Sequence, residues 1–180
     1  LISRISYNYD KKYYLEASAR RDGSTRFSEE SRWGNFYSIG GSWIASEESF
    51  IKDIDFINYL KIKASYGELG NNRGIGYFPY LQLFETGFSQ GENPGVLSSS
   101  PVDPILTWEK TAMLNYGIEF GIFDGLLDGS VEIYNKESID LIYDKPLAIS
   151  TGNDFIKTNV GSLRNYGVEF SLRSTIIDKE

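Results

Sequence analysis

The sequence predicts an all-β protein: an antiparallel, up-and-down transmembrane β-barrel architecture, with about seven strands in these 180 residues. Apolar and polar residues alternate with a period of two in seven segments, as in strands that have one apolar face. The connections between the segments run short, long, intermediate, long, short and long, which is typical of outer-membrane barrels. The composition agrees, because 15% aromatic residues and 18 glycines favour strands and tight turns.

The first three predicted strands precede the connection at residues 47–58. In the second of them, Leu15 and Ala17 alternate with Glu16 and Ser18. Several of the seven segments reach about ten residues, which is longer than the usual strand of five or six and suits a membrane crossing. The three strands are predicted at residues 2–9, 13–20 and 36–46.

The fourth strand, residues 59–69, lies within "YLKIKASYGELGNN". Leu60, Ile62 and Ala64 alternate with Lys61 and Lys63, so one face is apolar and the other is charged. We expect the apolar residues to face lipid and the lysines to face a watery barrel interior. A soluble β-sandwich shows the same alternation, so this pattern does not decide between the two.

The last three strands are predicted at residues 109–123, 127–137 and 166–175. Their polar positions also carry full charges. A lumen-facing role in the barrel is predicted for Lys61, Lys63, Glu119, Glu132, Glu169 and Arg173.

The long connections, residues 21–35, 70–107 and 138–165, are predicted to be external loops, and the shorter ones, residues 10–12, 47–58 and 123–127, to be inner turns. Aromatic rings in the second loop could stack on sugar rings, or could pack the loop against itself or a covering protein. The candidate contacts with a substrate or partner are Tyr77, Tyr80, Phe84 and Trp108.

The composition excludes several kinds of site. The segment has no His and no Cys, so a histidine base, a cysteine nucleophile and thiolate or imidazole metal ligands are impossible within it. The net charge of −7 argues against nucleic acid as a partner. "RDGS" and "STGND" lack the spacing of a calcium loop, and "GNNRGIG" lacks a strand–helix context for phosphate. We therefore expect no catalytic residue, metal or cofactor, and an enzyme is the least supported class.

Five stretches, in order, cover nearly the whole chain and resemble the C-terminal barrel of SusC/RagA-type TonB-linked outer-membrane transporters. They are "RISYNYDKKYYLEASARRDGSTRF", "WGNFYSIGGSWIASEESFIKD", "LKIKASYGELGNN", "LTWEKTAMLNYGIEFGIFDGLLDGSVEIYNKESIDLIY" and "NVGSLRNYGVEF". The resemblance implies a barrel of roughly 22 strands around an N-terminal plug. The chain is then expected to be a fragment without plug, TonB-contacting segment or signal peptide.

The resemblance also implies a function. The family lies in the outer membrane of Gram-negative, Bacteroidetes-like bacteria, in contact with its lipid, and imports bulky oligosaccharides or peptides. Its partners are a SusD-like lipoprotein at the cell surface and the TonB–ExbB–ExbD complex, which acts through the plug. Two alternatives stay open at this point: a SusC-like barrel that is a structural component of a larger envelope or secretion assembly, and a soluble β-sandwich for binding or adhesion.

Overall fold

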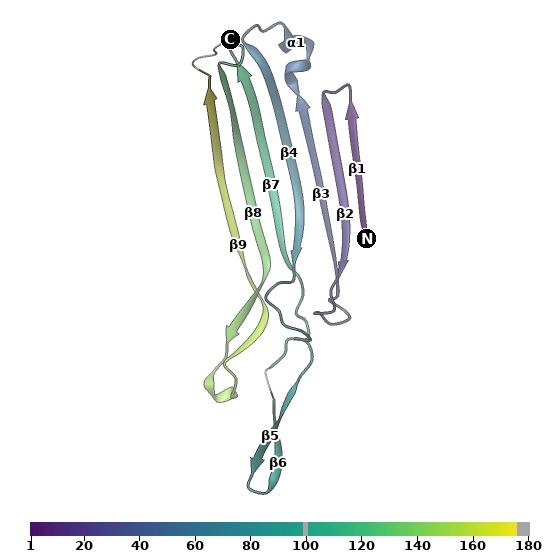
Figure 1. The fold of residues 1–180 in the computed structure, drawn as a ribbon, viewed down its shortest axis with the longest axis vertical. Helices are drawn as coiled ribbons and strands as arrows, with labels where there is room; N and C mark the ends of the chain where they lie inside the picture. The colour runs from purple at the N-terminus through teal and green to yellow at the C-terminus, as the bar shows by residue number, and fades with distance from the viewer. Residues whose placement is uncertain (99–100, 176–180) are drawn as a thin grey trace.

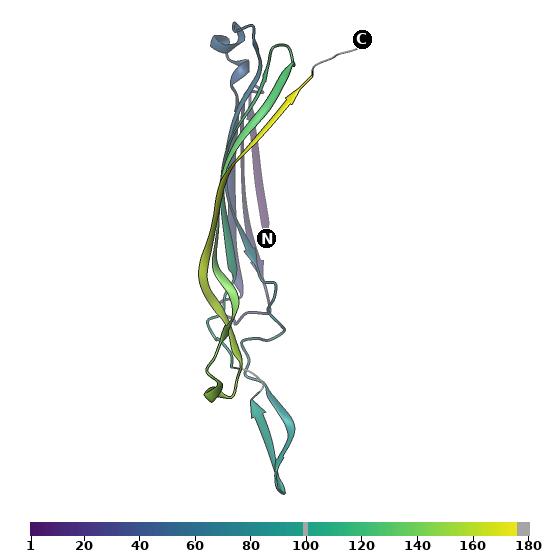
Figure 2. The same ribbon diagram turned by 90° about the vertical axis from the view of Figure 1, so that its left-hand side faces the viewer.

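The computed structural model describes residues 1–98 and 101–175, and most of them form one long sheet that is a single layer thick (Figures 1 and 2). Seven antiparallel strands lie in the order β1-β2-β3-β4-β7-β8-β9, so chain order is kept across the sheet. The predicted up-and-down arrangement of seven strands is confirmed. The strands are β1 (Ile2–Tyr9), β2 (Tyr13–Gly23), β3 (Trp33–Ile44), β4 (Ile57–Asn71), β7 (Glu109–Ile122), β8 (Leu127–Pro146) and β9 (Phe155–Ser174).

The two ends of the sheet differ (Figure 1). At the turn end, the connections are residues 10–12, 45–56 and 123–126, and the second of them holds the short helices η1 (Ala45–Glu47) and α1 (Ser49–Lys52). At the loop end, the connections are residues 24–32, 72–108 and 147–154. The last of these holds η2 (Ile149–Thr151), and the longest forms a separate hairpin of β5 (Phe84–Gln90) and β6 (Asn93–Ser98) that projects beyond the sheet.

Side chains alternate between the two faces of each strand, and the cross-strand register aligns this alternation over the sheet. Lys61 on β4 lies opposite Glu119 on β7, while the neighbouring Ile62 lies opposite Ile118. We call the face that carries Lys61 the polar face and the face that carries Ile62 the apolar face. No helix within residues 1–98 and 101–175 is long and apolar enough to cross a membrane.

The strands at the loop end are longer than predicted. The loop predicted at 138–165 is wrong over most of its length, because β8 and β9 pair as far as Pro146 and Phe155. Asp140 and Gly161 have positive φ values of 55° and 61°, and the alternation that predicts strands is lost around them. Backbone hydrogen bonds continue past this kink because they do not require an apolar face.

The other two predicted loops also need correction. The loop predicted at 21–35 shrinks to residues 24–32, because β2 and β3 stay paired up to Gly23 and Trp33. The connection predicted at 70–107 corresponds to residues 72–108, and it contains the hairpin of β5 and β6 instead of irregular chain throughout.

The buried apolar side chains of the described residues gather mainly at the loop end and not over the sheet. Trp108 packs against Phe27 with ring centroids 5.2 Å apart and against the edge of Phe36 at 5.6 Å. This cluster joins the connection after β2, strand β3 and both ends of the connection between β4 and β7. Its members are Phe27, Phe36, Ile75, Leu106 and Trp108, with Ile142 of β8 packed against them.

Candidate functional site: the two faces of the sheet

The middle of the polar face carries a network of ion pairs that joins three strands. Lys63 Nζ on β4 lies 2.8 Å from Glu119 Oε1 on β7 and 2.7 Å from Glu132 Oε1 on β8. Lys61 Nζ lies 3.8 Å from the other oxygen of Glu119. Four of the six predicted lumen-facing residues are therefore brought together on one face, although which face lines a lumen stays a prediction.

The network depends on a glycine in the central strand. Gly117 on β7 lies opposite both Lys63 and Glu132 in the register. A Cβ atom at this position would come within 2.5 Å of Lys63 Cε. The absence of a side chain at Gly117 thus lets the lysine cross β7 and reach a carboxylate two strands away.

The other two predicted lumen-facing residues lie on the same face but outside the network. Glu169 on β9 is exposed and lies opposite Glu132, and Arg173 lies opposite Asp128. Between β1 and β8, the polar face carries small and hydroxylated residues. Two adjacent grooves there are lined by residues that include Glu16, Ser38, Gly40, Ser65 and Asn115.

The apolar face is exposed over its whole central part. Ile118 is 44% exposed, Ile133 51%, and Phe170 65%. In β7 this face carries no charged side chain from Ala112 to Ile122; the residues between are Leu114, Tyr116, Ile118 and Phe120. Ten steps of about 3.3 Å give roughly 33 Å along the strand, and a tilt of about 40° reduces this to roughly 25 Å across a bilayer. That equals the apolar band of an outer-membrane barrel, about 25 Å tall.

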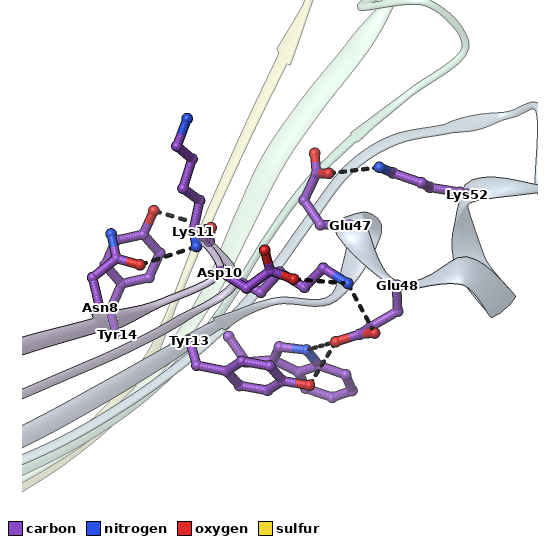
Figure 3. A network of polar contacts seen from close by, with 10 residues as sticks. Asn8, Asp10, Lys11, Tyr13, Tyr14, Glu47, Glu48 and Lys52 are labelled. Atoms are coloured by element: carbon purple, nitrogen blue, oxygen red, sulfur yellow. Dashed lines mark hydrogen bonds and ion pairs between the residues drawn. The ribbon is translucent and has the colours of Figure 1, made fainter.

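The turn end of the apolar face has an aromatic pair held by one carboxylate (Figure 3). Tyr13 and Trp43 stack with ring centroids 6.4 Å apart. Tyr13 Oη donates to Glu48 Oε1 at 2.6 Å, Trp43 Nε1 donates to the same oxygen at 3.2 Å, and Lys12 Nζ lies 3.4 Å from Oε2. The hydrogen bonds from Tyr13 and Trp43, followed by that from Lys12, hold the pKa of the Glu48 carboxyl below its usual range. We call these four residues the Glu48 clamp.

The predicted aromatic contacts of the long loop fall into two groups. Tyr77 is 79% exposed and Phe84 61%, while Tyr80 is half-buried. Trp108 is only 6% exposed, and its Nε1 donates to the backbone oxygen of Arg32 at 3.3 Å. Its ring is enclosed by the loop-end cluster and leaves little surface for the predicted contact with a substrate or partner, which stays a prediction.

Two features of this site were not predicted from the sequence. The Glu48 clamp joins Tyr13 at the start of β2, Trp43 near the end of β3 and Glu48 in the connection that follows. Its one sequence signal is that aromatic residues lie at the turn end of two adjacent strands. The loop-end cluster combines residues up to 81 positions apart, from Phe27 to Trp108. No local pattern marks such contacts.

The comparisons with known proteins agree with this geometry. The sequence model of the family described as "TonB dependent receptor-like, beta-barrel" matches residues 4–176. The chain belongs to this family. TonB-dependent receptor P39 of Formosa agariphila is 43% identical over 180 residues, which are 100% of this chain and 17% of that protein. TonB-dependent receptor SusC of Bacteroides thetaiotaomicron is 32% identical over 178 residues, or 95% of this chain and 18% of that protein.

Solved structures of a peptide importer contain a similar sheet. The RagAB peptide importer in its "closed-closed" state matches with a TM-score of 0.89, and in its "open-open" state with 0.87, both at 33% identity. Each match covers 99% of this chain, but 20% and 19% of the solved chains. The chain is thus of the SusC/RagA type of TonB-dependent barrel, and it spans about a fifth of the length of these relatives.

Proposed function

We propose that the protein containing this chain is an active transporter that imports a bulky nutrient across the outer membrane, with this segment as part of its barrel wall. The observation that carries the proposal is the contrast between the two faces. One is apolar, exposed and long enough to cross a bilayer, and the other carries the network of Lys61, Lys63, Glu119 and Glu132. A β-sandwich would cover its apolar face with a second sheet.

In this proposal, the apolar face contacts lipid and the polar face lines the interior beside the plug. Lys61, Lys63, Glu119, Glu132, Glu169 and Arg173 then face the lumen. Charged groups can stay there because water and polar plug groups solvate them, whereas on the lipid side of a barrel a Lys or Arg at the bilayer midplane costs about 2–4 kcal/mol.

The loop end is proposed to face outside the cell, where a SusD-like lipoprotein delivers the substrate. The long connections lie at this end, as expected for external loops. Tyr77 and Phe84 are exposed there and could contact a substrate or the lipoprotein. Energy would reach the barrel from the TonB–ExbB–ExbD complex through the plug.

For the substrate we propose an oligosaccharide, because exposed aromatic rings suit the apolar faces of sugar rings. A peptide is the second candidate, favoured by the likeness to the RagAB peptide importer. Both are too large to diffuse through a porin, which is why their import requires a gated barrel and an energy source.

The test is a deletion of the gene that encodes the parent protein, grown with single oligosaccharides or peptides as the limiting nutrient. We expect loss of growth on one substrate class and its recovery when the intact gene is restored. Unchanged growth and uptake on every oligosaccharide and peptide, together with secretion or envelope defects, would contradict import and favour the structural role of a SusC-like barrel.

A further inference from the structure

The charges that the strands themselves place on the apolar face lie at the loop end of the sheet. In β2 this face presents Tyr13, Leu15, Ala17 and Ala19 before the first charge, Arg21. In β9 the same order holds toward the loop end: Leu172, Phe170, Val168 and Tyr166 precede Arg164. Both arginines therefore lie just beyond the apolar band, at the end that the proposed function assigns to the outer leaflet.

Each of the two arginines lies over an exposed aromatic ring of the same face. The guanidinium carbon of Arg21 is 4.9 Å from the ring centroid of Trp33, and that of Arg164 is 5.8 Å from Tyr166. Trp33 is 55% exposed and Tyr166 77%. Stacking fixes the plane of a guanidinium group and leaves N–H donors at its edge for a planar or tetrahedral oxyanion.

Arginines of the polar face have a different environment. Arg4 is paired with Glu16 at 2.6 Å, and Arg20 with Asp22 at 2.7 Å. Arg21 and Arg164 have no ion-pair partner within the described residues; Arg164 Nε donates to the neutral Asn135 at 2.8 Å, although Glu137 lies opposite it in the register. Neither guanidinium group is therefore neutralised by a direct ion pair within the described residues.

The turn end of the apolar face has a different arrangement. There the aromatic pair Tyr13 and Trp43 is held by a carboxylate, Glu48, with Lys12 beside it, and not by arginine. At the loop end the strands also place Glu68, Lys110 and Glu137 on this face, but of the charged side chains there only Arg21 and Arg164 lie over aromatic rings within the described residues. A stacked guanidinium group is therefore offered to an anionic partner at the loop end alone.

Resting on the proposed function, we infer that Arg21 and Arg164 bind phosphate groups of outer-leaflet lipid headgroups. The acyl chains of such a lipid lie along the apolar band, and its phosphates meet the guanidinium groups at the band's upper edge. Arg21 and Arg164 lie on β2 and β9, so each binds a separate phosphate. Arginine suits this role because it can donate two parallel hydrogen bonds to phosphate.

The experiment uses the full-length transporter in mild detergent and bisphosphorylated lipid A as the probe, with native mass spectrometry to measure lipid occupancy. We expect R21Q/R164Q to bind lipid A about 25-fold more weakly, since each cation near an anionic lipid surface contributes about 1 kcal/mol, or about five-fold. The matched control R4Q/R20Q removes the same two charges from the polar face and should retain wild-type affinity.

A further variant and a second lipid make the outcome decisive. R21K/R164K keeps both charges and should bind far better than R21Q/R164Q, which excludes misfolding as the cause of the loss. Dephosphorylated lipid A should bind wild type as weakly as the phosphorylated lipid binds R21Q/R164Q. Equal loss in R4Q/R20Q, or equal affinity for both lipids, would overturn the inference. A parent protein that needs no detergent to stay soluble would instead contradict the proposed function.

Discussion

At the scale of single residues, Lys63 is the centre of the ion pairs on the polar face. It contacts two carboxylates at 2.8 and 2.7 Å, whereas Lys61 approaches one of them at 3.8 Å. We predict that K63Q lowers the free energy of unfolding of the full-length transporter by about 0.5–1 kcal/mol, and K61Q by less. The effect is modest because all four side chains are about a third exposed and solvent screens the pairs.

Urea unfolding in detergent measures this difference. The double variant K63Q/E132Q gives the control, because the loss in the pair should be smaller than the sum of the two single losses. An additive loss, or a larger effect of K61Q than of K63Q, would show that Lys63 does not bridge β7 and β8 as described.

Gly117 gives a second prediction at this scale. Replacing it with valine places carbon atoms where Lys63 Cε now lies, 2.5 Å from the position of the new Cβ. The lysine must then leave Glu132, so G117V should lose at least as much stability as K63Q, measured in the same way. In a K63Q background, most of this extra cost should disappear, since the shorter glutamine leaves room.

Glu48 gives a pH-dependent prediction. Because the folded state lowers the pKa of this carboxyl, its contribution to stability is fully present above the ordinary glutamate pKa, near pH 4.3, and is lost as the pH falls through the lowered folded value. We predict that the connection at residues 45–56 opens more readily near pH 3 than at pH 7. Hydrogen exchange, corrected for the intrinsic pH dependence, measures the opening.

The variant E48Q is the control for this prediction. Glutamine cannot ionise, so in E48Q residues 45–56 should be less protected from hydrogen exchange at pH 7 than in the wild type. Their protection should also change little between pH 7 and pH 3. If E48Q kept the full protection of the wild type at neutral pH, the carboxylate would not be what holds Tyr13 and Trp43.

At the scale of elements, the loop-end cluster holds both ends of the connection between β4 and β7, and the hairpin of β5 and β6 projects beyond it. Trp108 and Leu106 anchor the end of the long connection, and Ile75 anchors its start, while β5 and β6 form their own sheet beyond. Arg26 Nη1 also holds the start of this connection, because it donates to the carbonyl oxygens of Asn72 and Ile75 at 3.2 and 3.4 Å. The connection between β4 and β7 is therefore restrained at both ends.

We predict that W108A releases this connection. Truncating a buried tryptophan costs about 3–5 kcal/mol, because transfer free energy is lost and a cavity remains. Limited proteolysis of the full-length protein should cut residues 72–108 much faster in W108A, with the strands intact. The exposed Tyr77 is the matched control: Y77A should be cut at the wild-type rate, and equal cutting of both variants would contradict the anchoring role of Trp108.

The elements also show what a single sequence can and cannot predict. β1 was predicted with its exact ends, and the cores of the other six strands of the main sheet were also predicted, because period-two alternation is a local property. The extensions of β8 and β9 were missed, since Asp140 and Gly161 interrupt that alternation while backbone pairing continues. The grouping of Lys63, Glu119 and Glu132 on one face followed from the alternation of polar and apolar residues within each strand. The burial of Trp108, in contrast, depends on contacts between distant loops.

At the scale of the whole molecule, the sheet has one layer, and a hydrophobic core over its central part is absent from the described residues. A water-soluble domain covers its apolar face with a second layer. Here the apolar face stays open, and its charge-free length in β7 fits a bilayer. The edges at β1 and β9 also have unpaired backbone groups, which in lipid require further strands of the barrel.

The central claim is that lipid covers the apolar face and water reaches the polar face. Single cysteines placed along β7 of the full-length transporter, in a background without other cysteines, can carry spin labels at consecutive positions. In vesicles, we predict that labels at Tyr116, Ile118 and Phe120 collide with oxygen in the bilayer, and that labels at Asn115 and Glu119 collide with a water-soluble nickel chelate. Accessibility without this alternation, or with the two faces reversed, would contradict the account.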